Sequence, residues 1–210
     1  MIETLGVILT LIICVPLIII GPIALVVYIL NKVADFIDKK RLKMTKVINL
    51  FAGAGSGKST TAAGLFFLMK IHGYKVELVT EYAKELCYEG RLGEAQQMSI
   101  LGEQYNRQNR LVGKVDYIIT DSPLLLNAVY DDDETVIYSA KQLFKRFDNV
   151  NFFINRVKPF ANYGRLGDLE SNKAVDLRIK SLLVDYQVEA NVDGDINAPK
   201  TIFNILGLKR

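Results

Sequence analysis

The sequence is poor in the residues that build disulfide frameworks, metal clusters and histidine-based catalytic sites. Only two cysteines occur in 210 residues, Cys14 in an apolar run and Cys87 in a segment with helical periodicity. Their spacing gives neither a disulfide framework nor a metal-binding pattern. His72 is the single histidine, and its place before Gly73 at an expected helix end indicates a surface residue. We therefore do not expect a catalytic triad that contains histidine.

Charged residues are missing from Leu5 to Leu30. A helix over this run would be about 39 Å long, whereas the hydrocarbon core of a bilayer is about 30 Å thick. Pro16 and Pro22 would break a soluble helix but are better tolerated in a membrane helix. A cleaved signal peptide fits poorly, because the run is too long and Glu3 rather than a basic residue precedes it. We expect a transmembrane helix at residues 1–31.

Lysine and arginine cluster directly after the apolar run, in a predicted basic juxtamembrane linker at residues 32–45. Basic residues stay on the cytoplasmic side of a membrane. We therefore expect a single-pass protein, membrane-bound through residues 5–30, with its C-terminal domain in the cytoplasm. Anionic lipids would attract the same basic flank. Met44 is a second possible start that would give a soluble cytoplasmic protein, and the sequence leaves this choice open.

The net charge of +3 comes from this flank, because basic and acidic residues are equal in number from residue 47 onward. Proteins that bind nucleic acid carry a basic surface that neutralises phosphates. A neutral domain lacks that surface. We therefore expect no nucleic-acid partner.

Residues 46–210 alternate short apolar, β-branched segments with longer segments of helical periodicity. This alternation predicts an α/β fold of the P-loop NTPase type, with a parallel sheet between two layers of helices. The predicted strands are Lys46–Phe51, Lys75–Val79, Val115–Thr120, Val150–Ile154 and Val188–Val192. The predicted helices are Gly57–Ile71, Glu81–Glu89, Glu94–Val112, Glu134–Phe147, Ser171–Tyr186 and Ala198–Leu208. Residues 157–170 are polar and predict a mobile loop.

A phosphate-binding loop follows the first predicted strand, where residues 52–60 read AGAGSGKST. The pattern is GxxxxGK[ST] with Ala52 in place of the first glycine. Lys58 would neutralise the β- and γ-phosphates of ATP, and Ser59 would offer its hydroxyl group to Mg²⁺. The predicted nucleotide-binding residues are Gly53, Ala54, Gly55, Ser56, Gly57, Lys58, Ser59 and Thr60.

Asp121 ends the apolar strand VDYIIT, a position from which an aspartate holds Mg²⁺ through water in such sites. The alternative is that Asp121 caps the turn formed by Ser122 and Pro123. Motor ATPases place a glutamate directly after this aspartate to activate water, whereas this chain has Ser122. The chain also leaves no room for the helical lid domain of ring-forming ATPases. Both features favour a kinase.

Four segments carry a resemblance to a known family, and they read GAGSGKSTTAAGLF, VTEYAKEL, DYIITDSPLLL and INRVKPFANYGR. Together they resemble the nicotinamide-riboside kinase-like P-loop proteins. That family includes phage ATP-binding proteins of unassigned substrate, which look closest, and it is more distantly similar to deoxynucleoside kinases. The likeness runs from Met44 to about Leu208.

The resemblance implies roles for residues outside the phosphate-binding loop. Glu81 would be the general base that takes the proton of the attacking hydroxyl, and Tyr82 would contact the substrate ring. Gln104 would pair with a nucleobase, and Arg107 would reach phosphates. The alternatives are a helix-starting carboxylate for Glu81, favoured by the helix dipole, and a solvated helix face for Gln104, Arg107 and Arg110.

The resemblance also implies that Arg156 and Arg165 close over the transferred phosphoryl group and stabilise its charge. Residues 195–198 would contact adenine through their backbone. Asp131–Asp133 are instead interpreted as a loop and helix start rather than as a metal cluster.

We therefore expect an ATP- and Mg²⁺-binding kinase that transfers the γ-phosphoryl group to a small acceptor such as a nucleoside or nucleotide. The alternative is an ATPase or nucleotide-dependent switch that acts on water or a partner protein. A third interpretation is an ATP-binding module with weak catalysis. The sequence leaves the acceptor and the oligomeric state open.

Overall fold

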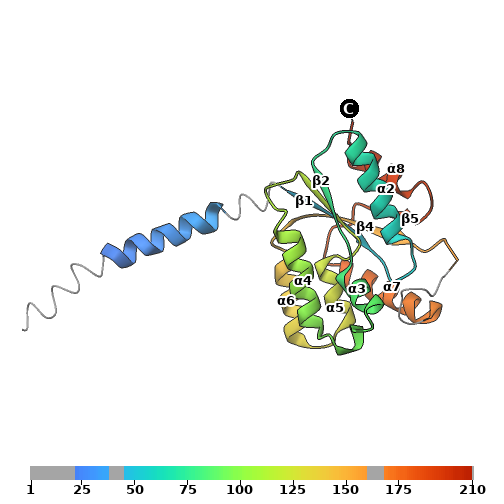
Figure 1. Cartoon of the computed structure of the whole chain (residues 1–210), viewed down its shortest axis with the longest axis horizontal. Helices are drawn as coiled ribbons and strands as arrows, with labels where there is room; N and C mark the ends of the chain where they lie inside the picture. The colour runs from blue at the N-terminus through green and yellow to red at the C-terminus, as the bar shows by residue number, and fades with distance from the viewer. Residues whose placement is uncertain (1–21, 38–44, 160–167, 210) are drawn as a thin grey trace, which may run out of the picture. The chain divides into compact units, whose positions relative to one another are not determined.

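A computed structural model describes residues 22–37, 45–159 and 168–209 (Figure 1). The chain divides into two compact units, residues 1–41 and residues 42–210. In the first unit, residues 22–37 are helical. The second unit holds all the other helices and strands of the described part.

The predicted transmembrane helix at residues 1–31 is wrong, and so is the single-pass membrane location. Within the described ranges, no helix is long and apolar enough to cross a membrane. Residues 22–37 would extend about 24 Å, less than the roughly 30 Å of a bilayer core. They also include Lys32 and Asp35, so the helix continues into the segment predicted as a linker. The first part of the predicted span, residues 5–21, lies outside the described residues.

Five parallel strands form one sheet in the order β2-β3-β1-β4-β5. The strands are β1 (Lys46–Phe51), β2 (Val76–Val79), β3 (Tyr117–Thr120), β4 (Asp148–Asn155) and β5 (Ala190–Asp193). The parallel α/β fold predicted from the sequence is thereby confirmed.

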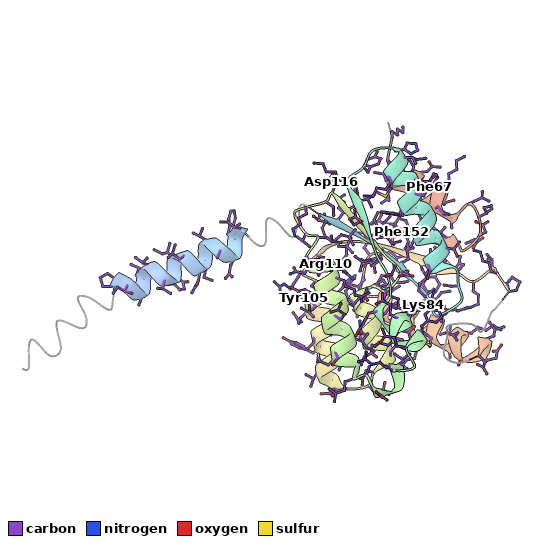
Figure 2. All side chains as sticks on the ribbon, viewed as in Figure 1. Phe67, Lys84, Tyr105, Arg110, Asp116 and Phe152 are labelled. Carbon is purple, nitrogen blue, oxygen red and sulfur yellow. The ribbon has the colours of Figure 1, made fainter. Side chains whose placement is uncertain are left out.

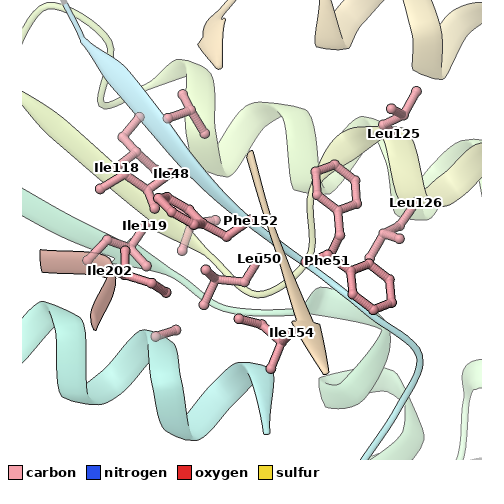
Figure 3. Close-up of a cluster of buried hydrophobic side chains, with 14 of the residues drawn as sticks. Ile48, Leu50, Phe51, Ile118, Ile119, Leu125, Leu126, Phe152, Ile154 and Ile202 are labelled. Carbon is pink, nitrogen blue, oxygen red and sulfur yellow. The ribbon is translucent and has the colours of Figure 1, made fainter. Parts of the chain in front are cut away.

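Strand β1 lies at the centre of the sheet, and every residue of it after Lys46 is buried. Figure 3 shows Ile48, Leu50 and Phe51 among the buried side chains of β3, β4 and neighbouring helices. Burial of each such side chain contributes roughly 1.5–3 kcal/mol. The strand therefore fixes the position of the loop that directly follows it.

Helices cover both faces of the sheet (Figure 1). Helices α2 and α8 pack together on one face, while α4, α5 and α6 contact one another on the other. The helices of this unit are α2 (Lys58–Ile71), α3 (Tyr82–Tyr88), α4 (Gln97–Asn109), α5 (Asn127–Tyr130), α6 (Glu134–Phe144), α7 (Leu169–Leu183) and α8 (Ala198–Ile205). Two short 3-10 helices, η1 (Leu92–Glu94) and η2 (Leu124–Leu126), precede α4 and α5.

The structure differs from the sequence prediction mainly at element ends and after β3. The predicted helix from Glu94 to Val112 is split into η1 and a shorter α4, because Ala95 adopts an extended backbone. Helices η2 and α5 were not predicted. The three leucines of η2 are buried, and a short apolar run alone does not distinguish a helix from a strand.

Candidate nucleotide and acceptor site

The phosphate-binding loop and three predicted site residues follow the carboxyl ends of four strands. The phosphate-binding loop comes after β1, Glu81 after β2, Asp121 after β3 and Arg156 after β4. Because the strands are parallel, these ends lie at the same edge of the sheet, which is where α/β proteins bind ligands.

The turn between β1 and α2 has the backbone shape of a phosphate-binding loop. Gly55 has φ of 81° and Gly57 has φ of 107°, a region that other residues adopt only with strain. A Cβ atom on Gly57 would also lie 2.9 Å from the carbonyl oxygen of Gly194. Helix α2 begins directly after Gly57, and its first turn has no acidic residue. Its first N–H groups therefore form an anion-binding helix end.

Lys58 lies under this loop with 8% of its surface exposed. Its Nζ atom donates hydrogen bonds to the carbonyl oxygens of Ala52 at 2.8 Å and Gly53 at 3.0 Å. The ammonium group is thus paired with neutral carbonyls rather than with a carboxylate. Binding a phosphate would give it the anionic partner that such a donor prefers.

Burial lowers the pKa of Lys58 below its ordinary value of 10.5. Three nearby carboxylates partly oppose this effect and raise the pKa: Glu81, Asp121 and Asp176. Two of them are predicted site residues, which places the predicted groups close to one another.

Helix α7 contacts the start of the loop, a feature that the sequence did not reveal. The backbone N–H of Gly53 donates to Asp176 Oδ1, and that of Ala54 donates to Asn172 Oδ1 at 3.0 Å. A Cβ atom on Gly53 would lie 2.7 Å from the carbonyl oxygen of Asn172 and 2.9 Å from Asp176 Oδ1. Glycine at position 53 is therefore required by the close approach of α7.

Arg156, the predicted phosphate-stabilising arginine, joins the same cluster. Its Nη1 donates to the carbonyl oxygen of Ala54 at 2.6 Å, and its Nη2 lies 2.9 Å from Asp176 Oδ2. Its side chain is 10% exposed. The arginine is thus fixed beside the loop. Arg165, its predicted companion, lies outside the described residues.

Asp121 and Ser59 fit the expected Mg²⁺ ligands. Asp121 is 4% exposed, and its Oδ1 atom is buried without a hydrogen-bond partner in the described part of the chain. A buried carboxylate oxygen without a partner is costly and is the type of ligand that Mg²⁺ takes, directly or through water. Ser59 lines the adjacent cavity, so its hydroxyl is accessible to a metal bound at phosphates.

One cavity of ≈ 460 Å³ extends from the phosphate-binding loop to a second region between α3, α4 and α5. The nucleotide end is lined by loop residues from Ala54 to Thr60, except Ser56, and the far end by apolar and amide side chains. The far-end residues are Leu92, Ala95, Gln97, Ile100, Leu126 and Asn127, and Tyr130 also lines the cavity. Lys84 of α3, labelled in Figure 2, also lines the cavity. These residues were not predicted from the sequence.

Glu81 lines the cavity between these two ends. It is the residue before α3, and its backbone is extended rather than helical. Its side chain makes no cap hydrogen bond to α3. Glu81 thus lines the cavity from the residue before α3, and its role as general base stays a prediction.

The other predicted acceptor contacts have partners within the chain. Gln104 is 1% exposed, accepts a hydrogen bond from the Tyr82 N–H at 3.1 Å and donates to the Thr80 carbonyl at 3.2 Å. Arg107 pairs with Glu85 and stacks over the Tyr82 ring at 4.7 Å. None of Gln104, Arg107 and Tyr82 is among the cavity-lining residues. Their contact with an acceptor stays a prediction.

The acidic run before α6 has a local role. Asp133 precedes the helix, and its side chain accepts a hydrogen bond from the Thr135 N–H at 2.7 Å. This is the helix start expected from the sequence. Asp195 likewise accepts from the N–H groups of Asn197 and Ala198, and predicted adenine contacts by this turn stay a prediction.

Known proteins show the same fold. Residues 47–198 match a family described as AAA domain. The fold is similar to a NadR protein in complex with NR, with a TM-score of 0.57 and 18% identity over 80% of this chain and 54% of that chain. This chain thus spans about half the length of that protein. The Mycobacterium tuberculosis APS kinase CysC in complex with AMPPNP and APS is more distant, with a TM-score of 0.46 and 10% identity over 79% of this chain and 99% of that chain.

No curated protein sequence matches this chain. The resemblance to P-loop kinase-like proteins is confirmed by the matched family and the NadR fold. The matches named here do not support the finer likeness to phage proteins.

Proposed function

This chain belongs to the P-loop family described as AAA domain, and from that premise we propose that it is an ATP-dependent phosphotransferase. It transfers the γ-phosphoryl group to a hydroxyl group of a small acceptor, such as a nucleoside or nucleotide. The proposal rests on the fold, the phosphate-binding loop and the space beside it.

The observation that carries the proposal is a cavity that extends from the phosphate-binding loop to Leu92, Ile100 and Leu126. A hydrolase needs room only for water next to the γ-phosphate. Here Leu92, Ile100 and Leu126 line a further space, and the whole cavity has the size of a small-molecule site. Such a space suits an organic acceptor beside ATP.

Each protein group has a task in this reaction. Lys58 and the N–H groups at the start of α2 bind the phosphates, for which Lys58 leaves the carbonyls of Ala52 and Gly53. Glu81 takes the proton as the acceptor oxygen bonds to the γ-phosphorus and the bond to the ADP oxygen breaks. Arg156, beside the loop, stabilises the charge on the transferred group. Ser59 and Asp121 would hold Mg²⁺, which neutralises charge on the phosphate oxygens.

The NadR protein gives a starting point for the acceptor, because it was solved in complex with NR. Nicotinamide riboside and the common nucleosides and nucleotides therefore make up a rational test panel. Full-length protein would be incubated with γ-labelled ATP, Mg²⁺ and each compound. We expect labelled product with at least one acceptor. Phosphate release at one rate whatever compound is present would contradict the proposal.

Lys58→Ala tests the nucleotide site in the same assay. We expect ATP affinity to fall by roughly 10- to 100-fold, as for loss of a charged hydrogen-bond donor, and transfer to be lost. Lys75→Ala, which changes an exposed lysine outside the cavity, is the control and should match the wild type. Isothermal titration calorimetry with ATP measures the affinity, and circular dichroism checks the fold. Unchanged affinity in folded Lys58→Ala would end the assignment of the loop.

ATP hydrolysis is the second candidate, favoured by the description of the family as AAA domain. Ser122 follows Asp121, so the glutamate that activates water in motor ATPases is missing from that position. Acceptor-independent phosphate release that depends on Lys58 would favour hydrolysis over transfer.

A further inference from the structure

The far end of the cavity contains an amide pair beside three apolar side chains. Gln97 begins α4 and Asn127 begins α5, and both line the cavity beside Leu92, Ile100 and Leu126. Gln97 Nε2 donates to Asn127 Oδ1 at 2.6 Å. Neither residue belongs to the phosphate-binding loop or to the groups proposed to transfer phosphate. Their place suggests contact with the acceptor.

The orientation of both amides follows from one backbone carbonyl. Asn127 is 3% exposed, and its Nδ2 donates to the carbonyl oxygen of Leu124 at 2.9 Å. Only the nitrogen of the asparagine amide can donate, so Oδ1 must face Gln97. Gln97 must then turn its own nitrogen toward Asn127. Its Oε1 atom is left to face elsewhere, and it accepts no hydrogen bond within the described ranges.

We propose that Gln97, oriented by Asn127, determines acceptor specificity by presenting its Oε1 atom to an N–H group on the acceptor. The proposal rests on the phosphotransferase function proposed above. The leucine and isoleucine walls favour a flat apolar body, and the Oε1 atom requires a donor on its edge. The expected ligand class is therefore a nucleoside or riboside whose ring carries an amino or amide N–H.

The energetic reason is that a ring bound in the cavity would displace water from Oε1, and a polar atom that loses water without gaining a partner is costly. An acceptor that lacks the donor would bury Oε1 unpaired. Sites built to hydrogen-bond a substrate N–H or O–H discriminate strongly against analogues without it. Gln97 would thus select the ring, while Glu81 acts on the hydroxyl group. The two tasks are separable by experiment.

The test measures binding and transfer separately. Binding of nicotinamide riboside, adenosine, cytidine and guanosine to full-length protein is measured by calorimetry with AMPPNP present, and transfer with γ-labelled ATP. Each compound is compared with its analogue in which the amino or amide hydrogens are replaced by methyl groups. We expect the wild type to bind the preferred compound at least tenfold more tightly than its analogue.

Gln97→Ala should weaken binding of the preferred compound about tenfold and remove the difference from its methylated analogue. Affinity for AMPPNP should stay unchanged. Gln96→Ala is the matched control, because Gln96 is the exposed neighbour that does not line the cavity. It should behave as the wild type. Asn127→Leu, which removes the orienting group, should reduce the discrimination while leaving AMPPNP affinity unchanged.

The outcomes separate this inference from the proposed function. If Gln97→Ala changes the rate of transfer less than twofold and still discriminates between the compound and its methylated analogue, the inference is overturned and the proposed function stands. If binding of a compound depends on Gln97 but no phosphoryl transfer occurs, the inference is supported and the proposed function is overturned. Binding of no compound in the panel overturns both.

Discussion

Glu81 and Asp121 follow neighbouring strands β2 and β3, yet their surroundings differ. Glu81 lines the cavity, where an acceptor can reach it. Asp121 is buried with an unpartnered oxygen. Accessibility suits a group that exchanges a proton with the acceptor, whereas a buried carboxylate suits a metal. The two residues should therefore respond differently to the same conservative change.

Glu81→Gln should lower phosphoryl transfer by roughly 10²–10⁴-fold, because the amide cannot accept a proton. ATP affinity should stay within the error of the wild type. Asp121→Asn should instead impair transfer and any hydrolysis alike and raise the Mg²⁺ concentration that is required. Steady-state kinetics over a range of Mg²⁺ concentrations distinguish the two patterns.

Glu94→Gln, at an exposed glutamate, is the control for this pair. If folded Glu81→Gln lost ATP binding, the glutamate would belong to the nucleotide site. A full rate of transfer would make it only the residue that precedes α3.

At the scale of elements, two contacts hold α3 against α4 beside the acceptor region. Gln104 bonds to the backbone on both sides of Glu81, at Thr80 and Tyr82. Arg107 forms two hydrogen bonds with Glu85, at 2.6 and 2.7 Å. These contacts fix the backbone that carries Glu81. Gln104 therefore has a structural role at this site, whatever its contact with an acceptor.

The Glu85–Arg107 contact predicts a specific dependence of stability on pH. The hydrogen bond from Arg107 lowers the pKa of Glu85 below its ordinary value of 4.5. A lowered carboxyl pKa stabilises the fold above the ordinary value, and this stability is lost as the pH falls through the lowered pKa. Glu85→Gln should therefore lose less stability than the wild type on acidification below pH 4.5.

The Glu85 side chain is 46% exposed. Because water screens an exposed ion pair, the difference in the free energy of unfolding should be small, roughly 0.2–1 kcal/mol. Urea denaturation at a series of pH values measures it, with Glu94→Gln as the control. Parallel curves for Glu85→Gln and the wild type would show that the pair does not stabilise the fold.

Two helical glycines predict opposite effects of the same substitution. A Cβ atom on Gly64 of α2 would lie 2.6 Å from Pro199 Cγ, so α8 would have to shift. We expect Gly64→Ala to destabilise the fold by about 1–2 kcal/mol, since overpacking outweighs the gain in helix propensity. Gly102 of α4 has open space, so Gly102→Ala should stabilise by about 0.5–1 kcal/mol. Chemical denaturation measures both. Equal effects would contradict the close α2–α8 packing.

At the scale of the whole molecule, the strands, the phosphate-binding loop and the cavity all belong to the unit at residues 42–210. A domain with its own core is expected to fold alone. The fragment 42–210 should therefore bind ATP with the affinity of the full chain, within about a factor of two. Calorimetry on both proteins provides the comparison. Loss of binding in a folded fragment would show that residues 1–41 contribute to the site.

The sequence by itself determined the parts of this protein that are contiguous along the chain. The phosphate-binding loop was predictable because strand, loop and helix follow one another, and the glycines are required by the local backbone. The positions of Asp121 and Glu81 at strand ends were predictable for the same reason, while their roles stay predictions. The alternation of strands and helices also indicated a parallel sheet. Local composition misled at the N-terminus, where an apolar run suggested a membrane span, and after β3, where η2 and α5 were not predicted.

The tertiary structure decided which distant side chains complete the site. Asn172 and Asp176 reach the loop from α7, more than a hundred positions away, and no local pattern reveals such a contact. Gln97 and Gln104 are two turns apart on α4, so helical periodicity places them on similar faces. Packing of α3 against α4 places Gln104 in hydrogen-bonding contact with the backbone near Glu81. Gln97 lines the cavity instead, where its amide bonds to α5. Sequence spacing determines which residues share one face of a helix, but only packing determines which groups that face contacts.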